Sequence, residues 1–184
     1  THAQSRAVEE ELIRSGIPYR IFGGLRFYER KEIKDILAYL RLVANPADEV
    51  SLRRVINEPR RGIGDTTIAR AEEAASREGK SLAYVLEHPI GIPNLGKRAI
   101  SALDRFFQMV NNWRKLDGAV SVASLVERIL EETGYLSILE AEKTVESETR
   151  LENLKEFLGV AQQYDSGGIG NTPGELEGVS GCGA

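Results

Sequence analysis

Most of the chain carries apolar residues at the spacing of amphipathic helices. The clearest stripe ends at Pro46 and consists of Ile33, Ile36, Leu37, Leu40 and Val43. Similar patterns predict further helices over residues 4–16, 48–57, 66–79, 81–89, 97–116, 121–134 and 147–164. Residues 17–24 instead alternate apolar and polar positions and end in two glycines, which predicts one short strand. The indicated fold class is mainly α, a helical bundle-like domain with one N-terminal strand.

The helical pattern stops after Tyr164, and residues 167–184 contain seven glycines without apolar periodicity. We therefore expect residues 165–184 to form a Gly-rich tail that is loop or disordered. No apolar run approaches the roughly 20 residues that a membrane span needs. One cysteine, Cys182, and two histidines provide neither a disulfide framework nor a zinc site. These features predict a cytoplasmic protein with no metal and no cofactor bound to this segment.

Charge is distributed unevenly along the chain. The formal net charge is −4, but residues 1–61 carry a net +3 and residues 62–184 a net −7. Such asymmetry is a hint of an interaction face, although most charged runs are simply solvated surface.

The sequence Asn-Glu-Pro-Arg-Arg-Gly-Ile-Gly-Asp-Thr-Thr, residues 57–67, places a tight turn beside two arginines. A Gly-Ile-Gly turn between two helices is the pattern of a helix-hairpin-helix. Gly62 and Gly64 permit positive φ and leave room for another backbone, while Ile63 can enter the space between the helices. Asp65 or Thr66 is expected to cap the second helix.

Such a turn can hold phosphate oxygens, because its N–H groups and the first turn of the next helix donate outward. Arg60 and Arg61 are expected to add mobile positive charge, giving sequence-independent binding of duplex DNA. The candidate residues are Arg60, Arg61, Gly62, Ile63, Gly64, Thr66 and Thr67. The alternative is an ordinary helix–helix turn with a C-terminal glycine. A second, weaker Gly-containing stretch, residues 92–99, is interpreted as a loop and a helix start.

Two long strings, residues 3–46 and 53–67, resemble the UvrD/PcrA/Rep family of superfamily 1 DNA helicases. The resemblance is close over residues 1–77 and continues to about residue 164. It implies that residues 1–24 are the edge of motor domain 2A (a helix and a short strand) and residues 25–164 are the helical 2B domain. It also implies a parent that uses ATP and Mg²⁺ to unwind DNA with 3′ to 5′ polarity in repair or replication.

The resemblance also assigns DNA contacts. Thr-His-Ala-Gln-Ser-Arg, residues 1–6, matches the family's motif IV, in which the contacting residue is usually Asn and is His2 here. The Gly-Gly-Leu-Arg-Phe segment places the second single-strand contact on Arg26. Residues 61–64, with Thr66 and Thr67, would contact duplex phosphates. Residues 17–24 and the region near 164 would be joints about which 2B rotates to regulate unwinding.

Other conspicuous residues have plainer interpretations. Phe27 and Tyr28 are expected to pack in the core or at a hinge rather than stack on bases. The charged residues of 29–35 are interpreted as a solvent-facing helix surface rather than a catalytic carboxylate set. Trp113 is expected to pack within its helix, and His88 to cap a helix end or lie on the surface.

The sequence contains no Gly-x-x-x-x-Gly-Lys-Ser/Thr phosphate loop, so we expect no ATP hydrolysis by this segment alone and no catalytic residues in it. We expect it to be a piece of a helicase, with a naturally shortened relative as the alternative. Its expected partners are duplex and junction DNA, the rest of the motor, and repair or replication proteins. A helical protein-docking module is the competing interpretation, since the acidic second half suits a basic partner. A nuclease or glycosylase is a third.

Overall fold

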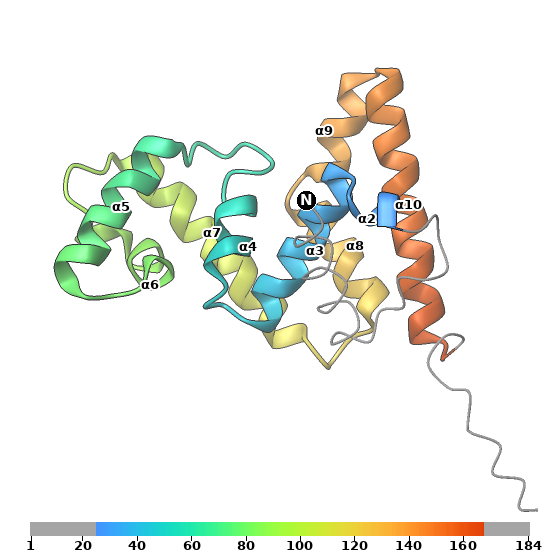
Figure 1. The fold of residues 1–184 in the computed structure, drawn as a ribbon, viewed down its shortest axis with the longest axis horizontal. Coiled ribbons are helices and arrows are strands. Elements are labelled where there is room, and N and C mark those ends of the chain that lie inside the picture. The colour runs from blue at the N-terminus through green and yellow to red at the C-terminus, as the bar shows by residue number, and fades with distance from the viewer. Residues whose placement is uncertain (1–24, 168–184) are drawn as a thin grey trace, which may run out of the picture.

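The computed structural model describes residues 25–167, which fold into helices (Figure 1). The elements are α2 (Leu25–Tyr28), α3 (Lys31–Ala44), α4 (Glu49–Val55), α5 (Asp65–Glu78), α6 (Leu82–Glu87), the 3₁₀ helix η1 (Pro89–Gly91), α7 (Lys97–Leu116), α8 (Val122–Glu132), α9 (Tyr135–Glu142) and α10 (Val145–Asp165). The mainly α prediction is confirmed for this part of the chain. The predicted helix over 4–16, the strand over 17–24 and residues 168–184 of the tail lie outside the described residues.

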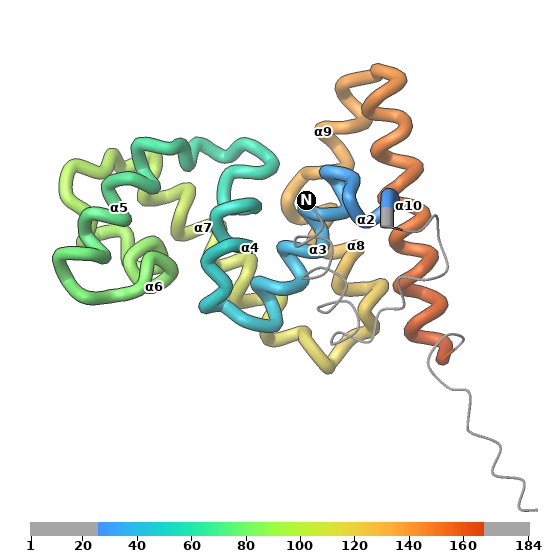
Figure 2. The backbone as a smooth tube through the Cα atoms, viewed as in Figure 1, coloured from blue at the N-terminus to red at the C-terminus, as the bar shows by residue number. Residues whose placement is uncertain are grey.

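Helix α3 lies at the centre of the arrangement and packs against α4, α7, α8 and α10. Helices α5 and α6 lie on one side of α3 and α4, and α8, α9 and α10 lie on the other (Figures 1 and 2). Helix α7 contacts α6 as well as α3 and α8, so it joins the two sides. The turn of interest, residues 56–64, connects α4 to α5 and therefore leaves this central region toward the α5 side.

One continuous hydrophobic core runs through both sides. Trp113 of α7 is fully buried and meets Tyr39 of α3 edge-on, with ring centroids 5.8 Å apart. Its indole Nε1 donates a hydrogen bond to Glu132 of α8 at 2.7 Å. The packing role predicted for Trp113 is confirmed, as are those of Phe27 and Tyr28, which are 2% and 3% exposed.

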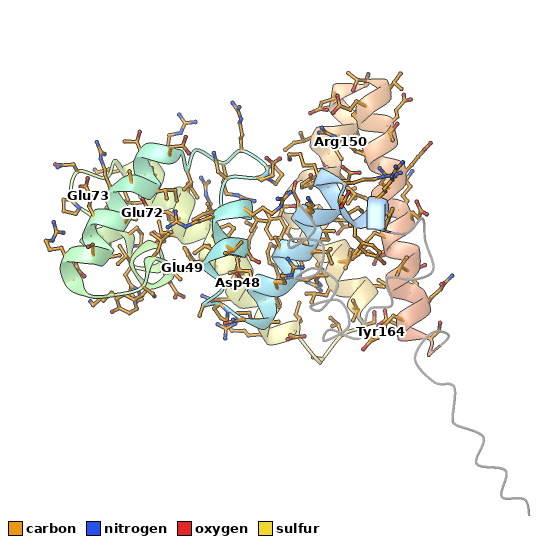
Figure 3. The ribbon with its side chains drawn as sticks, in the orientation of Figure 1. Asp48, Glu49, Glu72, Glu73, Arg150 and Tyr164 are labelled. Atoms are coloured by element: carbon orange, nitrogen blue, oxygen red, sulfur yellow. The ribbon has the colours of Figure 1, made fainter. Side chains whose placement is uncertain are left out.

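Polar side chains cap the starts of several helices. Asp48 accepts a hydrogen bond from the Ser51 N–H at 3.0 Å and caps α4, and the adjacent Glu49 accepts from the Leu82 N–H at 3.1 Å (Figure 3). Glu49 thereby ties the start of α4 to the start of α6. Ser121 caps α8 as predicted, and His88 lies at the end of α6. Within residues 25–167, no helix has the length and apolar character needed to span a membrane.

The prediction of a solvent-facing charged surface over residues 29–35 is wrong for two carboxylates. Glu32 and Asp35 are 3% and 1% exposed. Glu32 accepts a hydrogen bond from the Asn153 side chain of α10 at 2.6 Å, and Arg30 donates to the same side-chain amide. Glu32 therefore faces α10, where the Asn153 amide supplies the polar partner that a buried carboxylate requires.

Asp35 joins three helices through its carboxylate. It accepts a hydrogen bond from the Tyr135 hydroxyl of α9 at 2.7 Å and pairs with Arg54 of α4 at 2.9 Å and Lys31 at 3.0 Å. Burial, followed by the neighbouring Asp35 charge, raises the pKa of Tyr135 far above its usual range. Tyr135 therefore stays protonated and donates to Asp35, and the carboxylate holds α4 to the α9 side of the molecule.

Candidate nucleic-acid interface

The turn between α4 and α5 contains one backbone position that needs glycine. Gly62 has φ +86°, in the left-handed region that side chains disfavour. Gly64 has φ −87° and ψ 179°, which is extended backbone, and it caps α5. Its carbonyl accepts from the N–H groups of Thr67 and Ile68 at 3.0 and 3.2 Å. The prediction that Asp65 or Thr66 caps α5 is wrong, because the helix begins one residue earlier than the side-chain pattern indicated.

Ile63 anchors the turn to the core. Its side chain is 1% exposed and belongs to the same hydrophobic cluster as the surrounding helices. Burial of an isoleucine side chain contributes about 1.5–3 kcal/mol. The predicted insertion of Ile63 is confirmed, and it leaves the flanking residues Gly62 and Gly64 exposed on either side.

Four residues in and just after the turn present main-chain N–H donors that have no acceptor in the described part of the chain. Gly62, Gly64, Asp65 and Thr66 are exposed, and their main-chain N–H groups have no acceptor among residues 25–167. Three of these groups belong to the start of the 14-residue helix α5, where the helix dipole favours an anion. Thr67 differs from them: its side chain is 8% exposed and its N–H donates to Gly64, so it is not available to a ligand.

The arginines near the turn are mostly committed to the protein itself. Arg53 pairs with Glu72 of α5 at 2.5 Å, and Arg54 pairs with the buried Asp35. The expectation that Arg61 is a mobile cation is wrong, since its guanidinium donates to the carbonyls of the end of α4. Arg60 is exposed and has no partner in the described part of the chain. It is the cation that remains free to meet a ligand at this turn.

Of the two residues assigned to single-stranded DNA, the described part of the chain contains only Arg26. Arg26 lies on the short helix α2 and is exposed, and His2 lies outside the described residues. Their roles remain predictions.

A separate hollow of about 320 Å³ lies near the other end of α5, where α6, η1 and α7 meet. Its lining includes three carboxylates, of Glu78, Glu87 and Asp104, and one lysine, Lys80. The excess of negative charge repels phosphate, so this hollow is poorly suited to a nucleic acid. The arrangement at residues 60–66 is the better candidate.

Sequence reasoning missed one residue of the turn, Asn57. Its side-chain oxygen accepts hydrogen bonds from the N–H groups of Arg61 and Ile63 at 2.9 and 3.1 Å. Asn often stabilises a turn by hydrogen-bonding nearby main-chain groups, so an Asn directly before the glycines was a signal from which this role could have been predicted. The stretch from 92 to 99 is a loop and the start of α7, as predicted, and Gly96 is the N-cap residue of that helix.

Comparison with known proteins supports the family resemblance of residues 3–46 and 53–67. The model of the UvrD-like helicase C-terminal domain matches residues 1–176. The ATP-dependent DNA helicase PcrA of Bacillus subtilis is 43% identical over 165 residues, covering 90% of this chain and 22% of that protein. PcrA of Staphylococcus epidermidis is 39% identical over 173 residues, covering 94% of this chain and 23% of that protein.

PcrA of Leuconostoc citreum is 39% identical over 165 residues, again 90% of this chain and 22% of the relative. The chain thus spans about a fifth of the length of the curated relatives it matches. The matched residues include the whole described region, with the turn and the helices on both sides of it. This chain belongs to the UvrD-like helicase C-terminal domain family.

Proposed function

We propose that residues 25–164 are the 2B accessory domain of an ATP-dependent 3′–5′ DNA helicase of repair or replication. In this proposal residues 1–24 are the edge of domain 2A, and the parent motor uses ATP and Mg²⁺. The α4–turn–α5 unit acts as a helix-hairpin-helix that grips duplex DNA at a junction through its phosphates. Arg26 and His2 contact the single strand, and rotation about residues 17–24 and the region near 164 regulates unwinding. The similarity to proteins named ATP-dependent DNA helicase supports the assignment.

The observation that carries the proposal is the set of exposed N–H groups at Gly62, Gly64, Asp65 and Thr66 beside Arg60, all without a partner among residues 25–167. Main-chain donors and a helix N-terminus bind phosphate oxygens without reading bases. A ligand that presents a row of phosphates and needs no sequence readout fits this arrangement. Duplex DNA is such a ligand.

Arg60→Ala tests the contact with phosphate. Loss of one cation is expected to reduce the slope of log affinity against log salt by about one unit. The measurement is fluorescence anisotropy of a labelled duplex over a series of KCl concentrations. Arg77→Ala is the matched control, because Arg77 is an exposed arginine in the last turn of the same helix. Equal slopes for wild type and Arg60→Ala would contradict the proposal.

Asp65→Asn is expected to increase affinity for duplex DNA roughly twofold. The exposed Asp65 carboxylate lies in the first turn of α5, so it repels a phosphate bound there by about 0.5 kcal/mol in high dielectric. The same titration at low salt measures this gain. Glu73→Gln removes the same charge from an exposed site two turns further along α5 (Figure 3), and we expect a smaller change. An unchanged or weaker affinity of Asp65→Asn would place the phosphate elsewhere.

The competing function is a helical module that docks a basic repair or replication protein. It draws on the acidic balance of residues 62–184. This alternative predicts that neither Arg60→Ala nor Asp65→Asn changes DNA affinity, and the two titrations therefore separate the two functions.

A further inference from the structure

The turn that carries the candidate phosphate site is held from inside by a single amide side chain. Asn57 Oδ1 accepts from the N–H of Arg61 at 2.9 Å and from the N–H of Ile63 at 3.1 Å. A carbonyl oxygen has two lone pairs, so both are used. These two N–H groups face the protein, whereas that of Gly62, which lies between them in sequence, has no acceptor among residues 25–167.

The Arg61 side chain also stabilises this turn, by bonding back to the end of α4 and to α3. Its Nη1 donates to the carbonyls of Val55 and Ile56 at 2.6 and 2.9 Å, and its Nη2 donates to the Tyr39 hydroxyl at 2.7 Å. The guanidinium carbon also lies 5.0 Å from the centroid of the Phe106 ring. The two carbonyls belong to the end of α4, where a cation complements the helix dipole.

Tyr39 completes the arrangement. Burial raises the pKa of Tyr39 to about 12, against the lowering effect of Arg61, so its hydroxyl is protonated at neutral pH. The hydroxyl donates to the Glu58 carbonyl at 2.5 Å while it accepts from Arg61. The residues that enter and leave the turn are thereby fixed to α3, α4 and α7.

We propose that Asn57 and Arg61 are positioning residues, which hold the turn so that the N–H groups of Gly62, Gly64, Asp65 and Thr66 face a phosphate. This inference rests on the proposed function and deepens it by dividing the two adjacent arginines into separate roles. Arg60 supplies charge to the ligand. Arg61 cannot do so without leaving three acceptors and an aromatic ring, and releasing them would free the turn.

The division of roles is tested by comparing Arg60→Ala, Arg61→Ala, Arg61→Lys and Asn57→Ala in anisotropy titrations of a labelled duplex against KCl. Arg60→Ala is expected to lower the salt slope by about one unit. Arg61→Ala and Asn57→Ala are expected to lower affinity about tenfold with a nearly unchanged slope, because neutral N–H donors release few counterions. Arg61→Lys should be intermediate, since one ammonium reaches fewer of the acceptors.

Amide hydrogen exchange followed by NMR tests the positioning directly and needs no DNA. Asn57→Ala should remove protection from the N–H groups of Arg61 and Ile63, whereas Asn57→Asp, which keeps the acceptor, should retain it. Protection in α10 shows that the fold is intact. If Arg61→Ala fails to fold, Arg61→Lys and Asn57→Ala carry the test.

The outcomes separate this inference from the proposed function. A loss of about one slope unit in Arg61→Ala, as in Arg60→Ala, would make Arg61 a phosphate ligand and overturn the inference while keeping the function. Absence of duplex binding by the unmodified chain would overturn the function. Unchanged protection of Arg61 and Ile63 in Asn57→Ala would overturn the positioning role with or without DNA.

Discussion

Asp35→Ala is expected to lower the free energy of unfolding by about 3 kcal/mol, the lower end of the cost of breaking a buried charged network. The Asp35 side chain is 2% exposed and accepts from Arg54, Lys31 and Tyr135. Its removal leaves the Tyr135 hydroxyl buried without this acceptor and Arg54 without its counter-charge. We expect the loss of unfolding free energy to lie at the lower end of that range because Arg54 is 37% exposed and can turn toward water.

Urea denaturation followed by circular dichroism measures this loss, with Lys31→Ala as the control. Lys31 belongs to the same network but is 45% exposed, so its removal is expected to cost at most about 1 kcal/mol. Similar losses in the two variants would mean that Asp35 is not the centre of the network. Because Arg54 lies on α4, directly before the turn, the Asp35 network also holds the candidate interface to the rest of the domain.

The long helices could be predicted because their own residues determine them. Helix α7 occupies residues 97–116 as expected, since its apolar residues recur along one stripe and Gly96 precedes it. Helix α9, residues 135–142, was not among the predicted elements. Only Tyr135 and Leu139 are buried in it, and two positions give too little periodicity to stand out.

The charged positions of α3 could not be placed correctly from sequence. Acidic and basic residues three and four apart are typical of a solvated helix face, and nothing local distinguishes Glu32 and Asp35 from such a face. Their partners Asn153 and Tyr135 lie 121 and 100 residues away along the chain. Only the folded arrangement of α3, α9 and α10 supplies them.

The turn was predicted in part. The need for glycine at Gly62 and the burial of Ile63 follow from their types and spacing, and both are observed. Arg60 and Arg61 are adjacent residues of one type, and the sequence could not say which points outward. The open carbonyls at the end of α4 decide it, because they lie within reach of Arg61 and draw its guanidinium inward.

Gly64→Val is expected to weaken duplex binding about a hundredfold, because charge-assisted hydrogen bonds contribute roughly 1.5–3 kcal/mol each and the variant obstructs more than one. Gly64 has extended backbone, and a Cβ added there meets nothing within 4 Å. The valine therefore fits the fold, and we expect its branched side chain to crowd the neighbouring N–H groups of Gly64 and Asp65, which have no acceptor among residues 25–167.

Gly96→Val is the matched control for this variant in the same anisotropy titration. Gly96 caps α7 with φ −72° and ψ 151°, and an added Cβ there also meets nothing within 4 Å. Both variants lose a favourable helix cap at a cost of about 1 kcal/mol or less, so a difference between them in DNA binding reflects the site and not stability. We expect Gly96→Val to bind as the unmodified chain does. Equal affinities of Gly64→Val and the unmodified chain would mean that phosphate does not approach the start of α5, and the proposed grip on duplex DNA would then have to be abandoned.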